Sequence, residues 1–170
     1  KGKNPELFFF GGVFPEGGQL AKQAKEVGLT APMLSGDGVI DPKFIEIAGA
    51  AAEGTYLTFT PDPENMPEAK GFLEKYKAKH GNELAPYAIY SYDATNILLT
   101  ALAEAEKEGK IKDGKRVAEI MRNVNYDGAL GHIEFDEKGD VKKSPYIVWI
   151  TKNGKFEEFV SGFGYSLGVP

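Results

Sequence analysis

One acidic residue lies where a strand end could present it to a ligand. Asp37 stands between Gly36 and Gly38, directly after the short apolar run Met33–Leu34. Ligands of open α/β sheets bind beyond the carboxyl ends of the strands, because the loops there have no packing role. The pattern therefore allows a carboxylate that faces a cationic group of a ligand. It equally allows a turn aspartate that accepts a hydrogen bond from its own backbone.

A second loop of the same kind follows the apolar run Leu7–Phe10. It begins at Gly11-Gly12 and carries Val13, Phe14 and Glu16. If both apolar runs are strands of one parallel sheet, both loops belong to the edge where ligands bind. The two loops are therefore the candidate binding site.

Catalytic and cofactor chemistry is not indicated. The chain has no cysteine and no G-x-S-x-G motif, and its two histidines, His80 and His132, stand alone, so no nucleophile–base pair is visible. No His or carboxylate spacing suits a metal ion. The glycine pairs Gly11-Gly12 and Gly17-Gly18 do not form G-x-G-x-x-G, and no P-loop lysine follows them. We expect no catalytic residue, no metal and no cofactor.

Tyrosines gather at the start of the longest helical pattern, Tyr87–Lys107. Tyr87, Tyr90 and Tyr92, with Tyr76, could form the packing face of a helix, or they could present a rim of aromatic rings to a ligand. For most of them the helical spacing favours packing.

Bulk properties exclude several classes of protein. A hydrophobic share of 42% in 170 residues is typical of a globular chain. The net charge is -5 with no basic stripe, so nucleic acid is not expected as a partner. No apolar run approaches the roughly 20 residues of a membrane span. Because Lys1–Glu6 leads almost directly into a strand, we expect a segment upstream of it.

The elements that hold the two loops alternate between strand and helix patterns. Leu7–Phe10 is apolar without alternation, as in a strand covered on both faces of a parallel sheet, and an amphipathic segment follows at Gln19–Val27. Asp41-Pro42 indicates the start of another helix, and Thr55–Thr60 is a β-branched and aromatic third strand. The sequence thus predicts an α/β fold with a parallel sheet.

The pattern changes after the third strand. Pro61-Asp62-Pro63 interrupts it, and this stretch is the best candidate for a crossing between layers or domains. From Gly131 onward the alternation predicts antiparallel strands, with a tight turn at Asn153-Gly154. The predicted regions are strand–helix units at 1–60, a crossing with helices at 61–128, and a return segment with antiparallel strands and a tail at 129–170.

The order of several segments resembles one family. These are FFFGGVFPEGGQLAKQAKEVGL, MLSGDGVIDPKF, IAGAAAEGTYLT, PYAIYSYDATNIL and HIEFDEKGDVKKSPYIVW. From Pro5 to about Phe159 the chain resembles the leucine/isoleucine/valine-binding proteins, the periplasmic solute receptors of amino-acid ABC transporters. The resemblance implies a type I periplasmic binding fold of Rossmann-like lobes, of which this chain would be the C-terminal half.

The resemblance also implies roles for individual residues. In that family two lobes joined by three crossings hold the ligand, and Pro61–Pro63 and residues 125–130 look like the second and third crossings. Asp37 matches the acidic residue that takes the ligand's α-ammonium group, and Tyr87 matches an aromatic residue at a helix start. Val13 stands where the family has an aromatic residue that packs on the ligand, and Phe14 follows it. The residues that bind the ligand carboxylate would belong to the other half.

The implied function is an extracytoplasmic receptor for an amino acid, not an enzyme. An ABC permease would be its membrane partner, the location would be periplasmic, and a signal peptide would lie upstream. Alternatives are a receptor of the same fold for an amide, urea or aromatic acid, or a flavodoxin-like enzyme or regulator domain. Since half of the receptor would be missing, we expect the isolated chain to self-associate.

Overall fold

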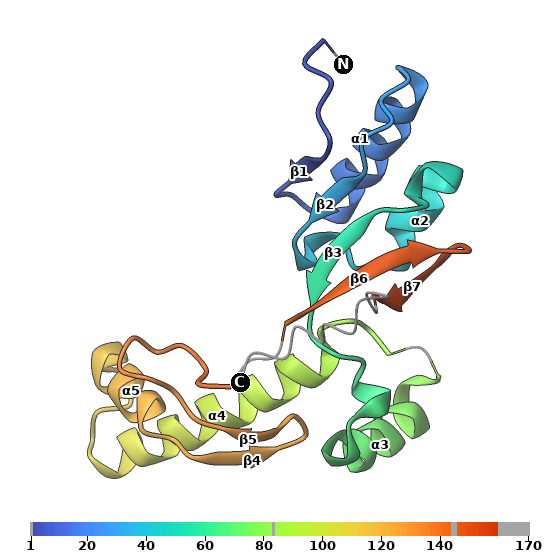
Figure 1. Cartoon of the computed structure of the whole chain (residues 1–170). Helices are drawn as coiled ribbons and strands as arrows, with labels where there is room; N and C mark the ends of the chain where they lie inside the picture. Colours follow the sequence, from blue (N-terminus) through green and yellow to red (C-terminus); the bar gives the residue numbers. More distant parts are fainter. Residues whose placement is uncertain (1, 83, 144–145, 160–170) are drawn as a thin grey trace. The chain divides into compact units, whose positions relative to one another are not determined.

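The computed structural model describes residues 2–82, 84–143 and 146–159, which form two compact units (Figure 1). Unit 1 combines the stretches 2–61 and 146–159, and unit 2 contains the described residues from 62 to 143. The first boundary lies at the proline-rich stretch. The second lies beyond residue 143 and not at 128, so the segment from 129 to 143 belongs to unit 2. The tail at 160–170 is outside the described residues.

Each unit has its own set of elements. Those of unit 1 are β1 (Phe8–Phe10), α1 (Phe14–Glu26), β2 (Met33–Ser35), the 3₁₀ turn η1 (Asp37–Val39), α2 (Pro42–Ala48), η2 (Gly49–Ala52), β3 (Tyr56–Phe59), β6 (Ile147–Lys152) and β7 (Lys155–Glu158). Those of unit 2 are η3 (Pro63–Asn65), η4 (Pro67–Ala69), α3 (Lys70–His80), α4 (Ala88–Lys107), α5 (Gly114–Arg122), β4 (Tyr126–Gly128) and β5 (Gly131–Ile133).

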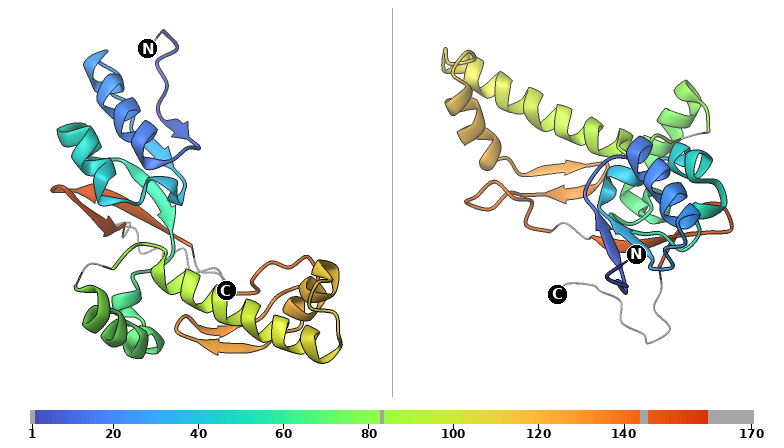
Figure 2. Two further views of the ribbon diagram at one scale, coloured as in Figure 1. Left: turned by 180° about the vertical axis from the view of Figure 1, so that it is seen from behind. Right: turned by 90° about the horizontal axis from the view of Figure 1, so that it is seen from above.

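Unit 1 is built on a five-stranded sheet in the order β1-β2-β3-β6-β7. The first three strands are parallel, and β6 and β7 extend the sheet in antiparallel fashion. Two consecutive right-handed crossovers place α1 and α2 on the same face of the sheet (Figures 1 and 2). On that face the fully buried Phe44 of α2 stacks on Phe156 of β7, with ring centroids 6.3 Å apart. The predicted α/β class with a parallel sheet is confirmed.

The first helix begins earlier than the sequence pattern indicated. α1 starts at Phe14 and not near Gln19, so Phe14 and Glu16 lie in the first helical turn and the loop prediction for both is wrong. Pro15 explains the early start, because its fixed φ suits the first helical turn. The N–H of Gly17 closes that turn by donating to the carbonyl of Val13 at 3.0 Å.

The first strand is an edge strand, and the expectation that both of its faces are covered is wrong. Among the described residues β1 pairs only with β2. Its middle residue, Phe9, has 66% of its surface exposed. The face of the sheet that carries Phe9 therefore presents an aromatic ring to solvent in this part of the chain.

The predicted tight turn between the last two strands is confirmed. Lys152 and Lys155 pair across it, and both intervening residues have positive φ, 52° at Asn153 and 72° at Gly154. An Asn-Gly pair adopts these angles at little cost, and the resulting turn matches the twist of a hairpin. Beside β3, the Trp149 indole N–H donates to the carbonyl of Thr60 at 3.0 Å, which joins the two separate stretches of unit 1.

Unit 2 is organised along the long helix α4, with α3 near one end and α5 near the other (Figure 1). A cluster of small residues, Ala101 and Ala105, packs with Val117 of α5. A second cluster joins Ile89 to Leu73 of α3. No helix of the described residues is both long and apolar enough to cross a membrane.

A buried aspartate holds a hairpin against α4. Asp93 has only 1% of its surface exposed, and its carboxylate accepts hydrogen bonds from the backbone N–H groups of Ala129 (3.0 Å) and Leu130 (2.7 Å). These two residues form the turn between β4 and β5. The segment 125–130, which the family resemblance marks as a crossing, contains strand β4 and the hairpin turn that follows it, and all of it lies within unit 2.

Candidate functional site

The loops after β1 and β2 are brought together at one edge of the sheet of unit 1. The last residues of the two strands, Phe10 and Ser35, are paired in the parallel register. The buried Ser35 hydroxyl also donates to the Phe10 carbonyl at 2.8 Å. Since the strands run in parallel and end side by side, their following loops start from the same place.

Asp37 occupies the loop after β2. It is half-buried, and its carbonyl accepts a hydrogen bond from the Ile40 N–H at 3.0 Å, which closes the 3₁₀ turn η1. The fully buried Val39 anchors this turn in the core. Asp37 is therefore part of an ordered turn at the carboxyl end of the sheet, where the sequence placed it.

Val13 and Phe14 occupy the junction between the loop after β1 and helix α1. Val13 is the residue before the helix, has extended backbone angles and is 53% exposed. Phe14 is half-buried in the first turn, and Glu16 is exposed in the same turn. The exposed apolar side chain of Val13 lies at the same sheet edge as Asp37, so the structure brings these two candidates into one region.

Tyr87 belongs to unit 2. It directly precedes α4, its carbonyl accepts a hydrogen bond from the Ser91 N–H at 2.9 Å, and 44% of its surface is exposed. The prediction of a helix start at this residue is confirmed to within one position, because α4 begins at Ala88.

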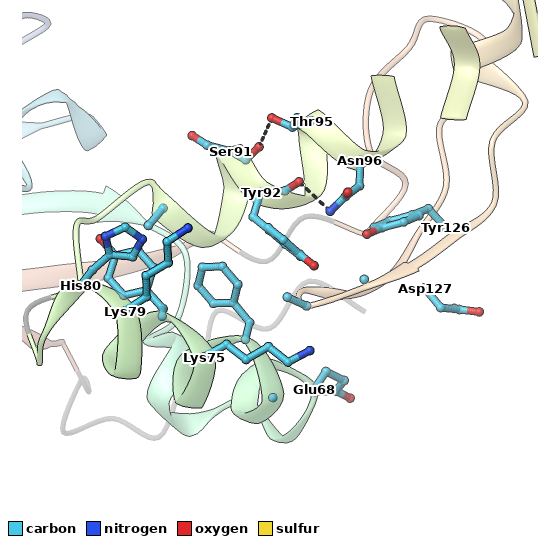
Figure 3. Close-up of a pocket in the computed structure, with 16 residues that line it drawn as sticks. Glu68, Lys75, Lys79, His80, Ser91, Tyr92, Thr95, Asn96, Tyr126 and Asp127 are labelled. Carbon is cyan, nitrogen blue, oxygen red and sulfur yellow. Dashed lines mark hydrogen bonds between the residues drawn. The ribbon is translucent and has the colours of Figure 1, made fainter. Parts of the chain in front are cut away.

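A separate cavity of about 730 Å³ lies in unit 2, between α3, α4 and the β4–β5 hairpin (Figure 3). An aromatic group lines one part of it: the Phe72 ring is 5.1 Å from that of Tyr92 and 5.6 Å from that of Tyr76. None of the four predicted site residues lines this cavity. Two of its aromatic residues, Tyr76 and Tyr92, belong to the group of tyrosines that the sequence marks as a packing face or an aromatic rim.

Two of the polar side chains that line this cavity, Thr95 and Asn96, bind the backbone of their own helix. Figure 3 shows the Thr95 hydroxyl donating to the Ser91 carbonyl (2.6 Å) and the Asn96 amide donating to the Tyr92 carbonyl (3.1 Å). Burial raises the pKa of the Tyr126 phenol, and the charge of the nearby Asp93 carboxylate raises it further. That phenol therefore stays neutral at physiological pH. The lining therefore combines the aromatic rings with charged side chains of both signs: Glu68, Lys75, Lys79 and Asp127.

Each of the two histidines contacts side chains of its own unit. His80 ends α3, where its ring lies 4.9 Å from that of Tyr76. His132 lies in β5, with Nδ1 2.6 Å from Asp127 and Nε2 3.1 Å from Glu134. Within the described ranges no cluster of three or more His, Cys, Asp or Glu residues could hold a metal ion.

Comparison with known proteins assigns the chain to a family. The family described as "Periplasmic binding protein" matches residues 1–155. The chain belongs to the periplasmic binding protein family. This assignment removes the flavodoxin-like alternative, and the fold agrees with it. A leucine-binding protein from Thermotoga maritima has a TM-score of 0.75 and 38% identity over 92% of this chain and 44% of that one.

Two further relatives of this family are named for the amino acids they bind. A Leu/Ile/Val-binding protein homolog from Brucella suis is 36% identical over 149 residues, which make up 87% of this chain and 39% of that protein. A leucine-, isoleucine-, valine-, threonine- and alanine-binding protein from Pseudomonas aeruginosa is 33% identical over 85% of this chain and 38% of its own length. The chain thus spans about two fifths of the length of these periplasmic binding proteins.

Proposed function

We propose that this chain is part of an extracytoplasmic receptor that binds a branched-chain amino acid and delivers it to an ABC permease. The observation that carries the proposal is the similarity over most of the chain to proteins named for binding leucine, isoleucine and valine. The receptor binds and releases its ligand without catalysis. Its location is periplasmic, as the family name implies.

Asp37 is the residue we propose to accept the ammonium group of the amino acid. Its place at the carboxyl end of β2, in a turn anchored by buried Val39, supports this role. Because the turn orders the backbone of Asp37, the carboxylate loses only side-chain freedom when the ligand binds. Val13 and Phe14, at the end of the neighbouring strand, are proposed to contact the apolar side chain of the ligand. Tyr87 is a further proposed packing residue, from unit 2.

The test is calorimetric titration of leucine, isoleucine and valine into a full-length receptor that carries this sequence. Asp37→Ala should weaken binding by about 2–5 kcal/mol, the cost of leaving one member of a buried charge pair without its partner. The matched control is Glu46→Gln, which removes one negative charge from an exposed position of the same unit. It should leave the affinity unchanged.

Two results would contradict the proposal in different ways. Unchanged leucine affinity in Asp37→Ala would make Asp37 a turn residue only. Binding of acetamide, urea or benzoate with no response to leucine would instead favour a receptor of the same fold for another ligand.

A further inference from the structure

The two loops of the proposed site are in contact at Gly38 and Gly12. Gly36, in the same loop as Gly38, makes no such contact. A methyl group built on Gly38 would overlap the carbonyl oxygen of Gly12 and would lie 3.5 Å from the Cα of Val13. Gly36, two residues away, has no neighbouring atom within 4 Å of such a methyl group. Neither glycine has a positive φ, so alanine suits the local backbone at both positions. Only the contact distinguishes them.

The loop after β1 also packs against side chains of the core, Phe10 and Val39. The ring of Phe10 lies where a side chain on Gly12 would be, and a methyl group on Gly17 would come within 3.1 Å of the same ring. Gly17 would also meet Val39, at 2.9 Å, which is the buried residue of the turn that contains Asp37. The loop is therefore confined on two sides, by Phe10 and by the backbone at Gly38.

A hydrogen bond also connects the ends of β1 and β2. The Ser35 hydroxyl, 1% exposed, donates to the Phe10 carbonyl at 2.8 Å just before the two loops begin. The hydrogen bond at the base of the two loops and the backbone contact further out both limit how far one loop can shift relative to the other. Their relative position then determines where Val13 lies with respect to Asp37.

We propose that Gly38 is a positioning residue of the ligand site, because its missing side chain lets the Gly12–Val13 backbone pack against the turn that carries Asp37. This inference rests on the proposed function. A side chain at Gly38 displaces the loop after β1, and because backbone meets backbone there, no side-chain rotation can relieve the overlap. The displaced Val13 no longer contacts a ligand that Asp37 binds.

The experiment compares three alanine variants of the full-length receptor by leucine calorimetry. Gly38→Ala should weaken binding by about tenfold or more, since a site works only when its groups are held within about 0.5 Å of their places. Gly36→Ala should leave the melting temperature and the position of the loop after β1 unchanged, because no protein atom lies within 4 Å of its methyl group. Gly18→Ala is the control for lost stability. Its methyl group would press on Ile47 at 2.8 Å, at the contact between α1 and α2 and not at the loops. It should lower the melting temperature and leave the affinity unchanged.

NMR spectra of the ligand-free variants distinguish a shifted loop after β1 from a loss of folding. The amide NMR signals of Gly12 and Val13 should shift in Gly38→Ala and stay in place in Gly36→Ala. If Gly38→Ala does not fold, Ser35→Ala replaces it. That change removes the hydrogen bond between Ser35 and the Phe10 carbonyl, so it should shift the same signals and weaken leucine binding.

The outcomes distinguish this inference from the function on which it rests. An unmodified receptor that binds no amino acid overturns the proposed function. Normal leucine affinity in a folded Gly38→Ala variant overturns only the positioning role. An equal loss of affinity in Gly18→Ala and Gly38→Ala also overturns it, because general destabilisation would then account for the effect.

Discussion

Removing the Asp93 side chain should loosen the β4–β5 hairpin of unit 2. This carboxylate lies on α4, is 1% exposed and accepts the N–H groups of Ala129 and Leu130 at 3.0 and 2.7 Å. In Asp93→Ala the buried N–H of Ala129 and the half-buried N–H of Leu130 lose their acceptor. Asp93→Asn preserves the shape, but its amide oxygen can serve one donor while its NH₂ group faces the other.

The size of the effect follows from the number of hydrogen bonds lost. A buried donor without an acceptor costs about 1–3 kcal/mol and a half-buried one costs less, so Asp93→Ala should destabilise unit 2 by up to about 6 kcal/mol, and Asp93→Asn by about half as much. Against the roughly 5–15 kcal/mol of a typical domain, the alanine variant loses a large part of the total. Thr95→Ala, which removes an exposed hydroxyl from the same helix, should stay within about 0.5 kcal/mol.

Amide hydrogen exchange is the best assay, because a chain of two units need not unfold in one step. The exchange rate at Ala129 and Leu130 should be lowest in Thr95→Ala, higher in Asp93→Asn and highest in Asp93→Ala. In urea unfolding followed by circular dichroism, the midpoint concentration should fall in the same order. If exchange at Ala129 and Leu130 were as slow in Asp93→Ala as in the unmodified chain, the carboxylate would not hold the hairpin and the reasoning would fail.

Two further predictions concern His132 and the exposed apolar surface. Hydrogen bonds to Asp127, and then to Glu134, raise the pKa of His132 above its ordinary value of 6.5. The stability that His132 contributes should therefore be fully present below pH 6.5 and lost as the pH rises through the higher pKa of the folded chain; an NMR titration giving a pKa below 6.5 would contradict this. We also expect the isolated chain to self-associate through its edge strand, and Phe9→Lys to reduce light scattering, since a lysine on an edge strand opposes pairing. A monodisperse monomer of the unmodified chain would show that the exposed Phe9 surface drives no association.

Features set by neighbouring residues could be predicted from the sequence. Asp41 caps α2 as expected, accepting a hydrogen bond from the Lys43 N–H at 2.8 Å, and Asn153-Gly154 forms the turn of the last hairpin. The early start of α1 could also have been found, because Pro15 is a helix-start signal that the apolar periodicity alone does not use.

Features set by distant residues could not be read from the local pattern. The strands β4 and β5 have three residues each, and their turn is held by Asp93, 36 and 37 positions earlier in the chain. The same reason applies to the candidate site. Adjacent strand ends follow from a parallel sheet, but the contact between Gly12 and Gly38 joins two loops, and a glycine with ordinary backbone angles gives no signal of it.

The split of unit 1 between two stretches of sequence has a consequence for synthesis of the chain. The strand β3 leaves the ribosome long before β6, its neighbour, since Thr60 and Trp149 are 89 residues apart. At about 5–20 residues per second, β3 waits roughly 4–18 s with one edge unpaired. Unit 2 is continuous in sequence and is fully synthesised during this interval. The nascent chain therefore completes its inserted unit first, and unit 1 exposes a β edge to chaperones, or to other nascent chains, until its last two strands arrive.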